Sequence, residues 1–124
     1  MKLTIPLWLT ASALACGCGA SSPAVSQHLA DAQSAERSAT DLGAASQPRA
    51  QLHLQLAHEQ IVAADAAVRD GDNDKADRLL ARATSDAELA IALTREEVAK
   101  ADAQKAVVQS NTQQTTNANQ GATP

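Results

Sequence analysis

The sequence has almost no aromatic residues: one tryptophan, and neither tyrosine nor phenylalanine, among 124 residues. Aromatic side chains usually line ligand pockets and form the energetic centres of protein interfaces. That single aromatic residue, Trp8, lies close to the amino terminus. This scarcity counts against a pocket for a small-molecule substrate.

Cysteine is nearly absent as well, since Cys16 and Cys18 are the only two in the chain. Two cysteines so close together exclude an internal disulfide framework and a cysteine-based zinc site. Fourteen acidic residues against ten basic ones give a formal net charge of −4, which argues against a nucleic-acid partner. No glycine-rich phosphate loop and no Gly-x-Ser-x-Gly motif is present. We therefore predict a protein without enzymatic activity, cofactor or small-molecule substrate.

The amino-terminal segment has the order of a secretory signal. Met1 and Lys2 give a positive start, a mostly apolar run covers residues 3–14, and small residues surround Ala15. The run is about twelve residues long, whereas a spanning helix needs roughly 20. We predict that residues 1–15 are a signal peptide that is removed.

The cysteine that follows these small residues resembles the lipobox of bacterial lipoproteins. The resemblance implies that a fatty-acylated cysteine, carrying chains such as palmitate, becomes the new amino terminus and fixes the protein to a membrane. Cys16 is the favoured acceptor because it directly follows the apolar run, and Cys18 is the alternative. An ordinary secretory cut near Ala15 is a third interpretation. No aspartate follows either cysteine closely, which by resemblance to the sorting rule of lipoproteins favours the outer membrane, facing the periplasm.

Alanine dominates what is present, with 29 of 124 residues, and it is the strongest helix former. Strand-like alternation is missing. We predict a tether over residues 16–24 and an all-α domain over residues 25–108. Its fold is an antiparallel three-helix bundle or hairpin with one long C-terminal helix, partly tetratricopeptide-like. The expected helices cover residues 25–42, 48–70 and 73–108.

Four residues mark the expected turns between these helices. Gly43 is placed to end the first helix in a left-handed conformation. Pro48 suits the first position of the second helix, Gly71 follows its end, and Asp72 can cap the third. The last segment, residues 109–124, has no charge and little apolar content, so we predict a disordered polar tail.

The acidic turn at residues 70–74 alternates oxygen-bearing side chains as a calcium loop does. Lys75 and Ala81 nevertheless occupy the places where such a loop needs glycine and glutamate. His53 and His58 are five residues apart, which is a poor spacing for zinc ligands on one helix face. We predict no metal site and surface histidines. An envelope metal-binding or enzymatic protein that uses this turn is the alternative function.

The third expected helix carries a stripe with a period of seven residues, as in a coiled coil: Leu80, Ala87, Thr94, Ala101 and Val108. Such a stripe usually faces the core of the same domain. It can also dock a partner helix or a second copy of the chain. Large aliphatic residues are scarce in the domain, so we expect marginal stability or support from self-association.

The body of the chain resembles the domain-of-unknown-function family 4398, which occurs in small bacterial envelope lipoproteins. The segments that carry the resemblance are residues 31–36, 63–72 and 75–90, and it extends from His28 to about Ala106. The family implies no activity. The preferred interpretation is a lipid-anchored periplasmic helical protein with a structural or adaptor role. Its expected partners are the membrane and an envelope protein or a second copy.

Overall fold

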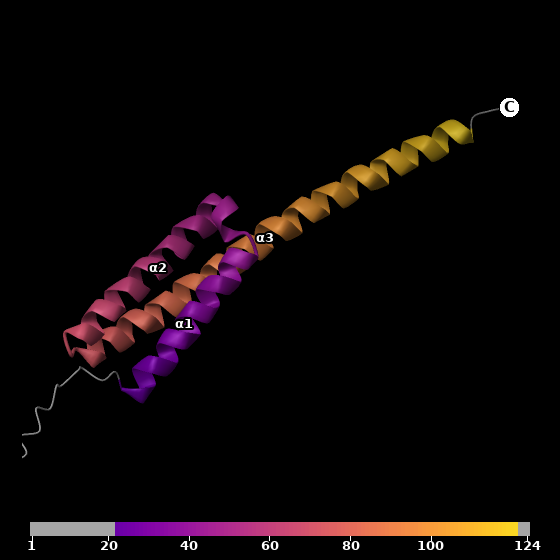
Figure 1. Cartoon of the computed structure of the whole chain (residues 1–124). Helices are drawn as coiled ribbons and strands as arrows, with labels where there is room; N and C mark the ends of the chain where they lie inside the picture. The colour runs from indigo at the N-terminus through magenta and orange to yellow at the C-terminus, as the bar shows by residue number, and fades with distance from the viewer. Residues whose placement is uncertain (1–21, 122–124) are drawn as a thin grey trace, which may run out of the picture.

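The computed structural model describes residues 22–121. They form four elements: α1 (Pro23–Asp41), a short 3-10 helix η1 (Ala44–Ser46), α2 (Pro48–Arg69) and α3 (Asn73–Gln120). The described part of the chain contains no β-strand. The predicted all-α, three-helix fold is confirmed, and of the two arrangements considered it is the bundle (Figure 1).

The start of α1 is set by a pair of residues that the sequence analysis placed in the tether. The hydroxyl of Ser22 accepts a hydrogen bond from the Val25 backbone N–H at 3.3 Å, and Pro23 occupies the first turn. Both features favour helix initiation. The helix therefore begins two residues before the predicted start at Val25. At its other end, Gly43 has φ of 87°, in the left-handed region that glycine adopts most easily.

The turn between α2 and α3 is a short reversal built on Gly71 and Asp72. Gly71 has φ of 80°, and its N–H donates to the Val68 carbonyl at 3.0 Å. The Asp72 carboxylate accepts from the Lys75 backbone N–H at 2.9 Å and caps α3. These two residues make the hairpin in which α2 and α3 run antiparallel, while α1 runs in the same direction as α3 (Figure 1).

The helices pack through small side chains that recur every seven residues. We call the following nine buried residues the heptad seam: Val25, Ala32 and Ala39 in α1; Ala50, Ala57 and Ala64 in α2; Ala76, Ala83 and Ala90 in α3. Eight of the nine are alanine, whose methyl group leaves room for close helix approach. α3 packs along both α1 and α2, and these two contact each other less.

Larger apolar side chains fill two clusters between the helices. Leu80 and Ile61 belong to the cluster near the α2–α3 turn, and Leu93 to the cluster near η1. Leu80 is the largest side chain that is fully buried, at 1% exposure. Thr94 is the last buried residue of α3 within the described chain, and its hydroxyl donates to the Ala90 carbonyl at 2.8 Å.

The third helix is longer than the sequence analysis predicted. Residues 109–120, predicted as a disordered polar tail, are helical, so the predicted helix end at Val108 is wrong. The segment contains no proline or glycine, and adding residues to a formed helix costs far less than nucleating one. Its threonine hydroxyls, such as that of Thr112, donate to carbonyls four residues back.

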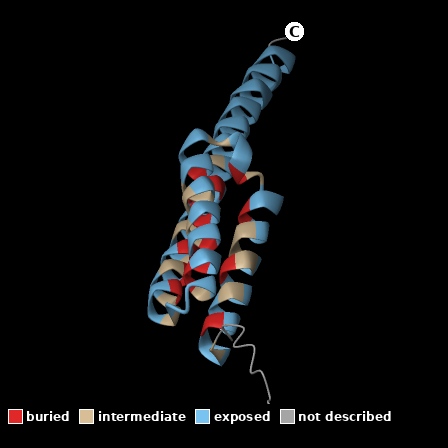
Figure 2. Ribbon diagram, turned by 60° about the vertical axis from the view of Figure 1, so that its left-hand side comes forward, coloured by how far each residue is buried: buried red, intermediate tan, exposed pale blue. Residues whose placement is uncertain are grey.

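The far half of α3 lies outside the bundle. Every residue from Val98 to Gly121 is exposed, as the uniform pale blue of this segment shows (Figure 2). We call residues 98–120 the α3 extension. At 1.5 Å per residue it is about 35 Å long, and the whole of α3 is about 72 Å long.

Candidate functional site

The turn at residues 70–74 does not assemble a metal site. Asp72 is engaged in capping α3. Across residues 22–121, no three His, Cys, Asp or Glu side chains come close enough together to hold a metal ion. Cys16 and Cys18, the predicted acylation sites, lie outside the described residues.

Among the histidine–carboxylate pairs that join helices, the most buried one joins α2 to α3 at Asp86. His53 Nδ1 donates to Asp86 Oδ1 at 2.9 Å, and Gln60 Nε2 donates to Asp86 Oδ2 at 2.7 Å. The side chains of His53 and Asp86 are 26% and 22% exposed. His53 and Gln60 are seven residues apart, so they lie on one face of α2 and hold the carboxylate between them. The Asp86 carboxylate thereby links α2 to α3 through two hydrogen bonds.

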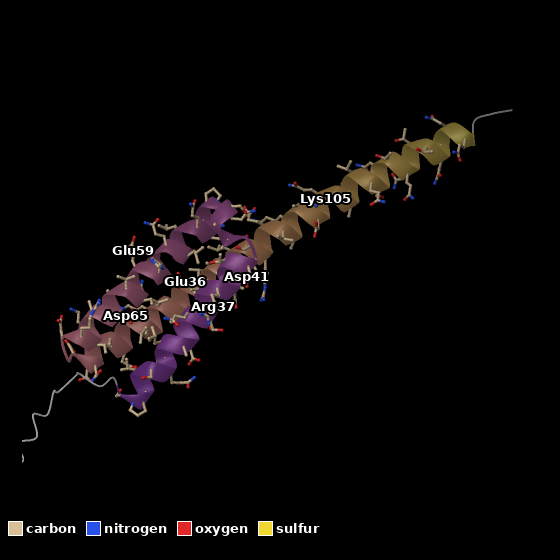
Figure 3. All side chains as sticks on the ribbon, viewed as in Figure 1. Glu36, Arg37, Asp41, Glu59, Asp65 and Lys105 are labelled. Atoms are coloured by element: carbon tan, nitrogen blue, oxygen red, sulfur yellow. The ribbon has the colours of Figure 1, made fainter. Side chains whose placement is uncertain are left out.

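The other two histidines make equivalent contacts at the remaining helix interfaces. His58 on α2 donates to Glu36 on α1 at 2.8 Å, and His28 on α1 pairs with Asp77 on α3. Figure 3 labels Glu36 on α1. The sequence analysis predicted that His53 and His58 are surface residues and did not anticipate these contacts. No local pattern reveals them, because the partners are between 22 and 49 residues apart.

A small groove lies where the start of α2 meets α3. It is lined by Gln47, Pro48, Arg49, Ala50, Leu93 and Glu97 and has a volume of about 260 Å³. Ligand sites usually enclose roughly 300–1,000 Å³. Arg49 Nη1 lies 4.0 Å from Glu96 Oε2 at this end of the bundle. The groove is too small for a typical ligand site, and its rim carries charges of both signs.

A charged cluster follows on α3 where the helix leaves the bundle. Lys100 Nζ lies 2.7 Å from Glu96 Oε1 and 3.2 Å from Glu97 Oε1. The hydrogen bond from Lys100 and then its positive charge lower the pKa of Glu96. Hydrogen bonds to the two carboxylates raise the pKa of Lys100. The cluster is exposed, so these shifts contribute little to stability in salt.

The α3 extension lies within the longest continuous run of exposed residues in the described chain. Val98, Val107 and Val108 are 51%, 60% and 65% exposed, and shallow depressions border the last two beside Ala101 and Gln104. Lys105, on the same stretch, stands well clear of α1 and α2 (Figure 3). A helix with no neighbour can offer a surface for contact but no enclosed reaction site.

The fold therefore defines a class: a small all-α bundle with one helix that projects beyond it. Residues 27–106, more than half of the chain, match the family Domain of unknown function (DUF4398), and the chain belongs to this family. The match covers nearly all of the bundle and ends within the α3 extension. Searches of curated proteins and of solved structures find no match. Among residues 22–121, no helix combines the length and hydropathy needed to cross a membrane.

Proposed function

We propose that the chain is an exported, lipid-anchored protein of the bacterial cell envelope with a structural or adaptor role and no enzymatic activity. The observation that carries this proposal is the order of residues 1–18: a basic start, a short apolar run, small residues and then cysteine. Cys16 is the proposed acyl acceptor, with Cys18 as the alternative. The proposed location is the outer membrane, facing the periplasm.

The shape of the described chain supports an anchored role. The amino-terminal end of α1 and the carboxyl-terminal end of α3 lie at opposite ends of an elongated molecule (Figure 1). Ser22 is six residues after Cys16, a distance of at most about 22 Å along the chain. A lipid on Cys16 would hold the start of α1 near the membrane, and α3 could extend away from it.

The distribution of polar groups supports a non-enzymatic role. The histidine–carboxylate pairs join helices to one another, and the groove near Arg49 is small. The α3 extension instead presents an exposed helix surface about 35 Å long. A protein that positions or joins other envelope components needs an anchor and such a surface, and it needs no cleft.

Metabolic labelling tests the anchor. Cells that express the full chain would be fed an alkyne-bearing fatty acid, and the purified protein would be analysed by intact mass. We expect a labelled chain that has lost residues 1–15. Cys16→Ser should abolish the label and Cys18→Ser should retain it, while density-gradient fractionation should place the wild type with the outer membrane.

Some results would contradict the proposal. An unlabelled wild-type chain in the soluble fraction with Met1 still attached would remove the anchor. Loss of label in Cys18→Ser with retention in Cys16→Ser would move the acceptor to Cys18 and keep the proposal. Label on neither cysteine, with a cut near Ala15, would indicate an ordinary secreted protein.

A further inference from the structure

The face of α3 that packs in the bundle continues into the extension with the same spacing. Its buried residues alternate in steps of four and three: Ala76, Leu80, Ala83, Ala87, Ala90 and Thr94. The same steps beyond Thr94 lead through Glu97 to Ala101, Gln104, Val108 and Asn111. Within the bundle the antiparallel helix α2 packs along α3, whereas no described element packs along the extension.

Packing against a second helix would stabilise the uncovered part of α3. Residues 109–120 include three threonines and three asparagines, which are weaker helix formers than the four glutamines beside them. Isolated helices are marginal in water even when their sequence is favourable. The centre of the extension also carries Val107 and Val108, the most exposed large apolar side chains of the described chain. These features indicate a helical partner.

The distribution of charge favours one direction when two copies pair. The charged residues near and in the extension all fall between positions 95 and 105: Arg95, Glu96, Glu97, Lys100, Asp102 and Lys105. None lies between positions 106 and 121. Two copies packed parallel and in register would bring like charges close together across the interface, which is unfavourable. Two antiparallel copies place each charged half against the uncharged half of the other.

We propose that the α3 extension pairs with the extension of a second copy of this chain, antiparallel and centred on Val107 and Val108. In this register Val107 lies opposite Val108 of the second copy, so the four most exposed valines meet at the centre. Gln104 lies opposite Asn111 of the second copy, where the two amides can exchange hydrogen bonds.

The same register fits the length of the free helix. Thr94, the last buried residue of α3, falls opposite Gly121 of the second copy, so the overlap uses the whole extension and stops where the bundle begins. The overlap is about 40 Å long. α3 of the second copy thereby continues the antiparallel relation that α2 has with α3 inside the bundle.

This pairing rests on residues 22–121 and does not depend on the proposed lipid anchor. It places the two bundles, and with them the starts of both α1 helices, at opposite ends of the pair. If the anchor exists, two copies anchored in opposed membranes can pair with their long axes perpendicular to both membranes. Copies in one membrane can pair only with their long axes along its surface.

Sedimentation of the purified full-length chain, in detergent if it is acylated, tests the pairing. We expect a concentration-dependent dimer, and the double variant Val107→Lys/Val108→Lys should raise its dissociation constant about tenfold or more. Val62→Lys is the matched control, because Val62 is 52% exposed but lies on α2. A chain that stays monomeric at every concentration, or a control that weakens the dimer equally, would overturn the proposal.

Photo-cross-linking tests the direction. A benzophenone amino acid in place of Gln104, in the full-length chain, should cross-link to the segment around Asn111 of a second copy, as mapped by mass spectrometry. A cross-link to the segment around position 104 of the second copy would indicate parallel packing and overturn the proposal. In cells, a dominant cross-link to a different protein would overturn it as well, whatever the state of the anchor.

Discussion

The two halves of α3 share one helix and one spacing but have different surroundings. In the first half, from Asn73 to about Glu97, the stripe with steps of four and three lies against α1 and α2. In the extension the stripe continues, yet every residue from Val98 onward is exposed. Figure 2 shows the change from mixed red, tan and pale blue in the bundle to uniform pale blue in the extension. The comparison teaches that a heptad pattern defines a helix face, whereas the neighbouring chain decides whether that face stabilises the fold.

The contrast extends to the side chains themselves. The first half places Leu80 and three alanines of the heptad seam where larger groups would not fit. The extension carries Val98, Val107 and Val108, which are more than half exposed and should lose little contact when they are shortened. Substitutions of matched chemistry in the two halves should therefore have very different effects on stability.

The largest difference is expected for truncation of a large apolar side chain. Leu80→Ala should lower the free energy of unfolding by about 2–5 kcal/mol, because Leu80 is 1% exposed and would leave a cavity. Val108→Ala should change it by less than about 0.5 kcal/mol, since that side chain is 65% exposed. Urea unfolding followed by circular dichroism at low protein concentration measures both. Equal effects would mean that burial does not separate the two halves.

Enlarging an alanine should give the next largest difference. Ala57 is fully buried in the heptad seam, so Ala57→Leu should force the helices apart and cost about 1–3 kcal/mol. Ala103→Leu adds the same atoms to an exposed position of the extension and should be nearly neutral. Urea unfolding of the two variants provides the measurement. A destabilised Ala103→Leu would show that the extension is closely packed in the monomer.

Glycine substitutions compare the two ends of α3. Gly71→Ala should cost about 1–2 kcal/mol, because φ of 80° is unfavourable for alanine, although nothing lies within 4 Å of the added methyl group. Gly121→Ala should be tolerated, since Gly121 has φ of −79°. Thermal unfolding of both variants tests this difference. If Gly71→Ala unfolds at the wild-type temperature, the turn is not restricted to its left-handed conformation.

The smallest effect concerns the charged cluster at the boundary between the halves. Lys100→Met should raise the pKa of Glu96 toward its ordinary value, because the hydrogen bond from Lys100 is the main cause of its lowering. Lys105→Met, one turn further on, should leave the pKa of Glu96 unchanged, since Lys105 pairs with Asp102. Titration of the Glu96 carboxyl carbon by NMR distinguishes these outcomes. An unmoved pKa in Lys100→Met would exclude the contact in solution.

The sign of the associated pH dependence follows from the direction of each shift. Folding lowers the pKa of Glu96, so its contribution to stability is present above the ordinary pKa and is lost as pH falls through the lowered one. Folding raises the pKa of Lys100, so its contribution is present below 10.5 and is lost as pH rises through the raised value. Both groups are exposed, and salt should weaken both contributions.

Local features of the sequence predicted most of the helical framework. Alanine content, Pro48 and the turn at Gly71 and Asp72 placed α2 and the start of α3 to within about a residue. The start of α1 was missed by two residues, although Ser22 and Pro23 form a recognisable cap. The end of α3 was missed because polar composition was interpreted as disorder, while nothing in residues 109–120 interrupts a helix.

The contacts between helices could not be predicted from the sequence. His28, His53 and His58 each pair with a carboxylate on another helix, and no spacing along the chain predicts such a pair. The point at which α3 leaves the bundle is marked in the sequence only by Glu97, the first charged residue on the stripe, beyond which the same steps reach Ala101 and Val108. That point depends on where α1, η1 and α2 end in space.

The sequence by itself determined that the chain is helical, where its turns lie and which residues recur on one face, because helix propensity, capping and periodicity act over a few residues. The tertiary structure alone decided which part of that face is covered, which charges meet and where α3 becomes free. Those outcomes depend on contacts between residues far apart in the chain, which form only when α1 and α2 are both laid against α3.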